Sequence, residues 1–154
     1  MRKIALFLGL IFITAACTKY DDISIEDVRP GNFTLHSTSK FTLTLDIKVN
    51  NPTKRKITIT DGTLEVFQQN RNLGTLSVGA PTVIAPKSND YNQLVLNGTI
   101  KDIMALFGIR FSADMSEMFD MFDVEGFLKV KAGVAGKKLK IDRTNFKNLL
   151  QGLL

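Results

Sequence analysis

The chain has 154 residues, 20 of them basic and 15 acidic, which gives a formal net charge of +5, and it contains one cysteine. This length fits one domain that buries a hydrophobic core of its own. The small positive excess is not the footprint of a nucleic-acid-binding protein, so no nucleic-acid partner is expected. A single cysteine excludes a disulfide framework within the chain.

The first sixteen residues have the pattern of a signal peptide. Two basic residues, Arg2 and Lys3, precede an uncharged apolar run over residues 4–13. That run is too short to span a bilayer and fits the core of an export signal. Small residues at 14–16 favour cleavage before Cys17. Loss of residues 1–16 removes two positive charges and leaves a net charge of about +3.

Cys17 is the predicted lipidation site. The stretch Ile13-Thr14-Ala15-Ala16-Cys17 resembles the bacterial lipobox, whose cysteine receives a diacylglycerol and becomes the new N-terminus. The alternative is an ordinary secretory signal followed by a chance cysteine. Lipidation also accounts for an unpaired cysteine in an exported protein, and two or three acyl chains hold a protein stably on a membrane. The membrane is therefore an expected partner, through the lipid on Cys17.

A short tether is expected to follow the cysteine. Residues 18–22 (Thr-Lys-Tyr-Asp-Asp) resemble the acidic export tags of Bacteroidetes lipoproteins. The alternative is a plain solvated tether. The expected location is the bacterial cell envelope, at the outer membrane, on its periplasmic face or on the cell surface. We assign residues 17–30 to the lipidated cysteine and the tether or first strand, and 31–154 to the folded domain.

The remaining chain is dominated by strand patterns. From Phe41 to Val49 apolar residues alternate strictly with polar ones, which is typical of a strand with one buried face. Asn50-Asn51-Pro52 ends it. Further strands are expected at residues 57–68 (with a turn or bulge at Asp61-Gly62), 73–76, 82–84, 91–100, 124–132 and 139–141, with turns at 70–72 and 133–138 and a terminal helix or turn at 145–153. Several short alternating strands predict an antiparallel β-sandwich.

Residues 101–122 interrupt this pattern. The segment 101–107 has good helix formers, Gly108 breaks it, and Ser112 is a plausible cap for a second short helix. We therefore expect a short helical insertion at about 101–122.

Several motifs occur in the order found in a known family. The strand Phe41-Thr-Leu-Thr-Leu-Asp-Ile-Lys-Val-Asn-Asn-Pro52, the pair Leu73-Gly74 and the loop Ile84-Ala-Pro-Lys-Ser88 resemble the late embryogenesis abundant type 2 family, also called the water stress and hypersensitive response (WHy) domain. The resemblance is clear over residues 31–96 and continues more weakly to 142. It implies an all-β, immunoglobulin-like antiparallel sandwich of about seven strands. It also implies a non-enzymatic role in stress tolerance, and some relatives are suspected of binding lipids.

The sequence offers little catalytic chemistry. His36 is its only histidine, and without a cysteine partner it does not provide a zinc site. Lipidation consumes Cys17, and no Gly-x-Ser-x-Gly motif is present. We expect no enzymatic activity, no catalytic residues, no metal and no cofactor.

Two surfaces are candidates for binding. Basic residues gather beside two predicted turns, where they either keep the loops soluble or contact anionic phosphates: Lys54, Arg55, Lys56, Lys137, Lys138 and Lys140. The insertion is rich in methionine and phenylalanine, which either plug the core or form an adaptable surface for an apolar ligand or a partner: Met104, Phe107, Phe111, Met115, Met118, Phe119 and Phe122.

The sequence therefore predicts a non-catalytic, membrane-anchored lipoprotein that serves as a binding or stress-tolerance module of the envelope, with an envelope protein or a lipid as its partner. The alternative is a carrier or sensor of an apolar, lipid-like ligand that uses the insertion.

Overall fold

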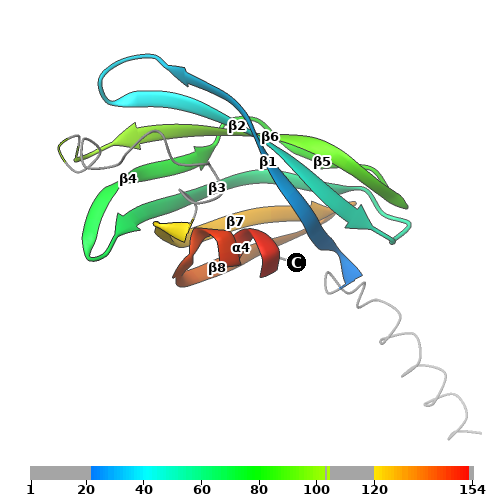
Figure 1. Ribbon diagram of the computed structural model, residues 1–154. Helices are drawn as coiled ribbons and strands as arrows, with labels where there is room; N and C mark the ends of the chain where they lie inside the picture. The colour runs from blue at the N-terminus through cyan, green and yellow to red at the C-terminus, as the bar shows by residue number, and fades with distance from the viewer. Residues whose placement is uncertain (1–21, 103, 105–119, 153–154) are drawn as a thin grey trace, which may run out of the picture.

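A computed structural model describes residues 22–102, 104 and 120–152. These residues form eight strands and one C-terminal helix (Figure 1): β1 (Ser24–Leu35), β2 (Lys40–Asn51), β3 (Ile57–Gln68), β4 (Arg71–Val78), β5 (Thr82–Ile84), β6 (Ser88–Ile100), β7 (Asp123–Ala132), β8 (Ala135–Asn145) and α4 (Phe146–Gly152). Apart from 101, 102, 104 and 120–122, the expected helical insertion lies outside the described residues.

All strand pairs are antiparallel. The hydrogen-bonded order is β1-β2-β6-β4-β3-β7-β8, and β5 pairs with β3. Strands β1, β2 and β6 form one layer and β3, β7 and β8 the other, with β4 pairing to both β6 and β3 (Figure 1). The prediction of an all-β, immunoglobulin-like antiparallel sandwich is confirmed, with eight strands among the described residues where about seven were expected.

Strand β2 shows why apolar and polar residues alternate over this part of the sequence. Its apolar residues Leu43, Leu45, Ile47 and Val49 are all buried and face the other layer. The same core includes Ile57, Ile59, Leu64, Ile84, Leu96, Val124, Val130, Ala132 and Ile141. Burial of each large apolar side chain contributes about 1.5–3 kcal/mol, so the two inner faces provide the main stabilisation.

The Asp61-Gly62 signal marks a bulge inside β3 and not a turn. The register with β7 shifts between Ile59 and Asp61. The Gly62 N–H donates to Asp61 Oδ1 at 2.8 Å. A Cβ on Gly62 would lie 2.9 Å from the backbone oxygen of Phe127, so the close approach of β7 favours glycine here.

Helix α4 lies against the two outer strands of the sheet. It contacts β1 and β8, and Phe146 and Leu149 are buried in the common core. The Asn145 side chain caps the helix by accepting a hydrogen bond from the Lys147 N–H at 3.0 Å. The helix therefore packs against both edge strands of the sheet.

A polar clamp holds the first half of β1. Asp27 on β1 and Tyr91 on β6 are both register partners of Lys48 on β2, so they lie in one row across three strands. Tyr91 Oη donates to Asp27 Oδ2 at 2.5 Å, Arg29 Nε donates to the same oxygen at 3.0 Å, and the Arg29 guanidinium lies 4.3 Å from the centre of the Tyr91 ring. The Tyr91 hydrogen bond, aided by Arg29, lowers the pKa of Asp27, and the same bond raises the pKa of Tyr91.

This clamp gives a testable pH dependence. The Tyr91→Phe variant keeps the ring under Arg29 but loses the phenol donor, so the pKa of Asp27 should rise toward its ordinary value near 3.8. Because the folded-state pKa is lowered, the clamp stabilises the fold above that ordinary value and is lost as the pH falls through the lowered one. NMR titration of the Asp27 carboxyl carbon measures both proteins. Identical titration curves would show that the phenol does not hold the carboxylate.

Candidate functional site

Three loops meet at the end of the sandwich where the chain enters the fold. Ser24, at the start of β1, is the register partner of Asn50 near the end of β2. The same end carries the β2–β3 loop (52–56), the β5–β6 loop (85–87) and the β7–β8 turn (133–134) (Figure 1). The chain that precedes Ser24 therefore joins the domain at this end.

The side chain of Asn51 organises these loops. It is fully buried. Its Nδ2 donates to Arg55 O at 2.9 Å and to Ala85 O at 3.0 Å, and its Oδ1 accepts from Thr53 N at 3.1 Å and Thr53 Oγ1 at 2.7 Å. One carboxamide thus uses both of its protons and its oxygen to join the β2–β3 loop to Ala85, which lies 34 residues after Asn51.

Backbone hydrogen bonds complete the assembly. Lys87 N donates to Thr53 O at 2.9 Å, and Gly133 N donates to Lys56 O at 3.3 Å. Both donors have left-handed backbones, with φ of 49° at Lys87 and 65° at Gly133. Glycine adopts this conformation readily, whereas lysine does so at a cost of about 1 kcal/mol. The β7–β8 turn is thereby tied to the β2–β3 loop.

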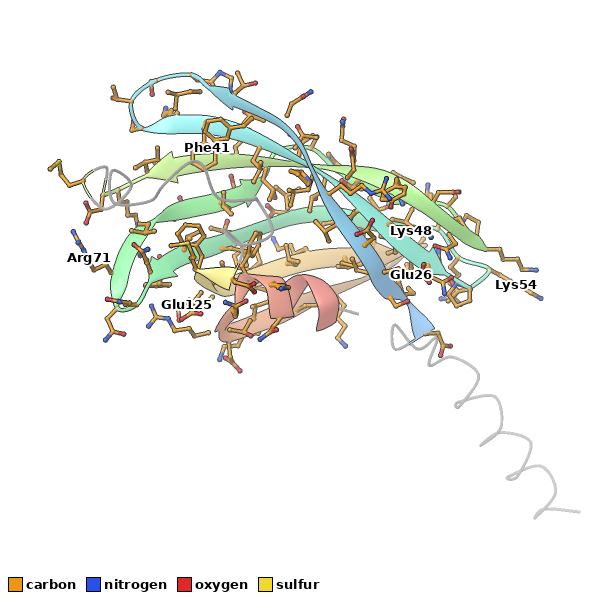
Figure 2. All side chains as sticks on the ribbon, viewed as in Figure 1. Glu26, Phe41, Lys48, Lys54, Arg71 and Glu125 are labelled. Carbon is orange, nitrogen blue, oxygen red and sulfur yellow. The ribbon has the colours of Figure 1, made fainter. Side chains whose placement is uncertain are left out.

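Four cations project from this assembly. Lys54, Arg55, Lys56 and Lys87 are exposed, and none of them forms an ion pair with another residue of the described ranges. The three loops contain no carboxylate. We call the loops 52–56, 85–87 and 133–134 the basic end; Figure 2 shows Lys54 there and Arg71 at the opposite end.

The second predicted basic cluster does not belong to the turn. The turn is limited to Gly133 and Val134, so the expectation of a turn over 133–138 was wrong, and Lys137, Lys138 and Lys140 lie in strand β8. The Lys138 ammonium lies 4.3 Å from the centre of the Phe127 ring, and Lys140 pairs with Asp142 at 3.1 Å. A left-handed Gly133 permits this tight turn, which starts β8 earlier than its sequence suggested.

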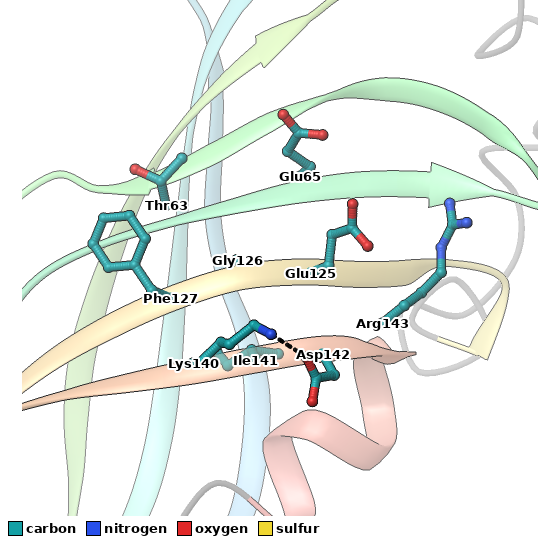
Figure 3. Close-up of a pocket in the computed structure, with 9 residues that line it drawn as sticks. All are labelled: Thr63, Glu65, Glu125, Gly126, Phe127, Lys140, Ile141, Asp142 and Arg143. Atoms are coloured by element: carbon teal, nitrogen blue, oxygen red, sulfur yellow. Dashed lines mark ion pairs between the residues drawn. The ribbon is translucent and has the colours of Figure 1, made fainter.

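A groove of about 530 Å³ lies on the outer face of β3, β7 and β8 (Figure 3). It is lined by Thr63, Glu65, Glu125, Gly126, Phe127, Lys140, Ile141, Asp142 and Arg143. Four of its five charged groups have protein partners: besides the Lys140–Asp142 pair, Glu65 Oε2 accepts from Asn72 Nδ2 at 2.9 Å, and the Arg143 guanidinium lies 3.7 Å from the Phe67 ring centre. The lining contains no histidine, cysteine or serine, and its polar side chains are one threonine, three carboxylates, one lysine and one arginine.

The remaining predicted site residues are only partly described. Met104 is exposed, and Phe122 is half-buried with its carbonyl accepting from Phe146 N at 2.9 Å. Five members of the Met/Phe surface (Phe107, Phe111, Met115, Met118 and Phe119) and the lipidation site Cys17 lie outside the described residues.

Other chemistry is sparse in the described part of the chain. The exposed His36 hydrogen-bonds through Nε2 to Thr42 Oγ1 at 2.8 Å. Residues 22–102, 104 and 120–152 contain no cluster of three or more histidine, cysteine or carboxylate side chains suited to a metal. Over the same ranges, no helix has the length and apolar character needed to cross a bilayer.

Sequence reasoning missed three contributors to the basic end. Lys87 lies in a motif noted for its proline, Val134 in a segment noted for its turn, and Asn51 in a motif interpreted only as a strand terminator. The Asn-Pro signal at 51–52 was the one hint available, because a buried asparagine beside a turn commonly satisfies nearby backbone groups.

Comparison with known proteins adds information on the fold alone. No protein-family model and no curated protein matches the sequence. A crystal structure of a protein from Archaeoglobus fulgidus is similar, with a TM-score of 0.52 and 11% identity over 79% of this chain and 94% of that chain. A crystal structure of a yeast GGA1 GAE domain matches with a TM-score of 0.36 and 13% identity, over 82% and 92% of the two chains. At these identities the likeness carries no function.

The role of Asn51 can be tested against its neighbour. Asn51→Ala removes the four hydrogen bonds of a buried carboxamide and leaves Arg55 O and Ala85 O with one side-chain donor each, Thr53 Oγ1 and Ser88 Oγ, so the free energy of unfolding should fall by about 2–3 kcal/mol. Asn50→Ala is the matched control, because the Asn50 side chain forms no hydrogen bond to a described residue; a change within about 0.5 kcal/mol is expected. Chemical denaturation measures both. Equal losses in the two variants would contradict the assignment.

Proposed function

We propose that this protein is a non-catalytic lipoprotein of the bacterial envelope, anchored by lipid on Cys17, whose sandwich acts as a binding or stress-tolerance module resembling late embryogenesis abundant type 2 domains. The observation that carries the proposal is where the chain enters the fold. The N-terminal segment joins β1 at the basic end, beside four exposed cations without ion pairs in the described ranges. An anchor on this segment brings that end of the domain toward the membrane.

The groove is consistent with a non-catalytic role, because its lysine and arginine are engaged within the protein. Lys140 pairs with Asp142, and the Arg143 guanidinium stacks on Phe67. The resemblance at Asn51-Pro52, Leu73-Gly74 and Ile84–Ser88 is consistent with that role, because Asn51 and the loop 85–87 are joined by hydrogen bonds and none of the motif residues lines the groove.

The alternative, a carrier or sensor of an apolar ligand, depends on the Met/Phe surface at 101–122. Among its described members, Met104 is 72% exposed, and its neighbour in the insertion Met121 is 43% exposed. Exposed methionines form adaptable contact surfaces. Mass spectrometry of lipid extracts from the purified protein tests this alternative, and a bound lipid that is lost in a Met104→Ser/Met121→Ser variant would favour it.

The anchor is tested by metabolic labelling with a fatty-acid analogue in a bacterial host. Wild-type protein and the neighbouring control Thr18→Ala should incorporate the label, and Cys17→Ala should incorporate none, because the chain has no other cysteine to form the thioether. The mass of the N-terminal peptide should show cleavage before residue 17 plus the acyl groups. Unlabelled wild-type protein, or label retained by Cys17→Ala, would overturn the proposal.

A further inference from the structure

We propose that the basic end is a docking surface for anionic phospholipid head groups, with Val134 inserted at the interface, so that the sandwich stands upright on the membrane that carries its anchor. This inference rests on the proposed lipid anchor for its geometry. It names one orientation and one partner, the phosphates of an anionic bilayer.

Charge complementarity is the first argument. The loops of the basic end contribute Lys54, Arg55, Lys56 and Lys87, and no carboxylate. Two exposed carboxylates lie beside these loops, Asp22 just before β1 and Asp90 in β6, while Glu26 already pairs with Lys48 at 3.5 Å. The surface therefore remains net positive. Its lysine and arginine side chains are long enough to reach lipid phosphates, and basic residues of this kind are attracted to an anionic leaflet.

The tip of the β7–β8 turn supplies an apolar contact. Val134 is fully exposed, with a relative accessibility of 104%, and is the most exposed of the large apolar side chains in the described ranges. Its neighbour Gly133 is hydrogen-bonded to Lys56, so the valine is held beside the cations. An apolar group next to basic residues matches the boundary between head groups and acyl chains.

The position of the tether is the third argument. Ile23 is buried and fixed in the core, and the stretch from Cys17 to Ile23 spans at most about 20 Å when fully extended. Strand β2, with twelve residues, places the opposite end of the sandwich about 35 Å away. With its lipid in the bilayer, the basic end is within reach of the surface, whereas the opposite end is held off unless the domain lies flat.

The loops are also preorganised for such a contact. The Asn51 carboxamide and the bonds Lys87 N to Thr53 O and Gly133 N to Lys56 O fix the three loops relative to one another. Binding then orders only the tips of the lysine and arginine side chains. This lowers the entropic cost of association compared with flexible loops.

The first experiment removes the anchor and measures the docking surface alone. The mature chain 17–154 with Cys17→Ala contains every described strand and α4, and its partition is measured by co-sedimentation with phosphatidylglycerol/phosphatidylcholine vesicles. Binding should be detectable with these vesicles, be absent with pure phosphatidylcholine, and weaken when salt is raised to about 0.5 M. The triple variant Lys54→Gln/Arg55→Gln/Lys56→Gln should lose about 100-fold in partition coefficient, roughly fivefold per cation.

The matched control carries the same change of charge at the other end. Lys40→Gln/Arg71→Gln/Lys101→Gln also removes one arginine and two lysines, from the start of β2, the start of β4 and the residue after β6. It should lose less than about fivefold, since these residues face away from the bilayer. If both triple variants lost the same factor in partition coefficient, the effect would depend on net charge alone and the proposal would be overturned. Equal binding of the protein to anionic and neutral vesicles would also overturn it.

A second readout reports orientation without depending on affinity. In the Cys17→Ala chain no cysteine remains, so Val134→Cys provides one site for an environment-sensitive NBD label, and Leu35→Cys, at an exposed position at the opposite end, is the control. With anionic vesicles, the label at 134 should shift its emission to the blue and be quenched by nitroxide lipids, and the label at 35 should not. The same response at both sites would overturn the proposal. Fatty-acid labelling of Cys17 is unaffected by these outcomes, so failure of docking and failure of the anchor are distinguishable.

Discussion

The buried carboxamide of Asn51 is the interaction on which this end of the sandwich depends. Asn51 is the last residue of β2, and both Val49 in the same strand and Ile57 at the start of β3 belong to the apolar core. A polar group in that position is tolerated because all four of its hydrogen bonds are made to Thr53, Arg55 and Ala85. Since leaving any of these groups unpaired costs about 1–3 kcal/mol, the β2–β3 and β5–β6 loops have one favourable arrangement. Asn51 thus converts two separate loops into one rigid unit.

That rigid unit also explains how four cations come to share one small surface. Like charges repel, and within the described ranges no ion pair to Lys54, Arg55, Lys56 or Lys87 offsets the repulsion. The arrangement persists because the backbone atoms of the same residues are held by Asn51, Thr53 and the β7–β8 turn. The left-handed Lys87 adds a further cost at this place. An anionic surface facing the loops would neutralise the repulsion, which is the physical link between the fold of this end and its proposed partner.

The sequence was informative where structure is local. Strand β2 was predictable because a half-buried strand records its two faces as alternation, and the Asp61-Gly62 signal correctly marked an irregularity in β3. The short β7–β8 turn was not predictable from the sequence. The start of β8 is rich in lysine, and its inward-facing apolar residues begin only at Leu139 and Ile141. The composition of the basic end was also unpredictable: Asn51 reaches Ala85 across 34 residues, and which loops meet is decided by strand order, which no local pattern encodes. Lys87 and Val134 therefore had no signal, whereas the cations at 54–56 were found directly.

The proposed anchor and the proposed docking surface act differently, and neither would replace the other. Three acyl chains fix a protein on a bilayer but leave a domain on a tether of about 20 Å free to rotate. Each cation near an anionic leaflet contributes about 1 kcal/mol of binding free energy. Such cations orient a domain, but they hold it weakly and their effect falls as salt is added. A tether raises the effective concentration of the basic end at the surface to the millimolar range, where such weak contacts are sufficient. On the proposed arrangement, covalent attachment at Cys17 determines the location of the domain, and the loops organised by Asn51 determine which face it presents to the rest of the envelope.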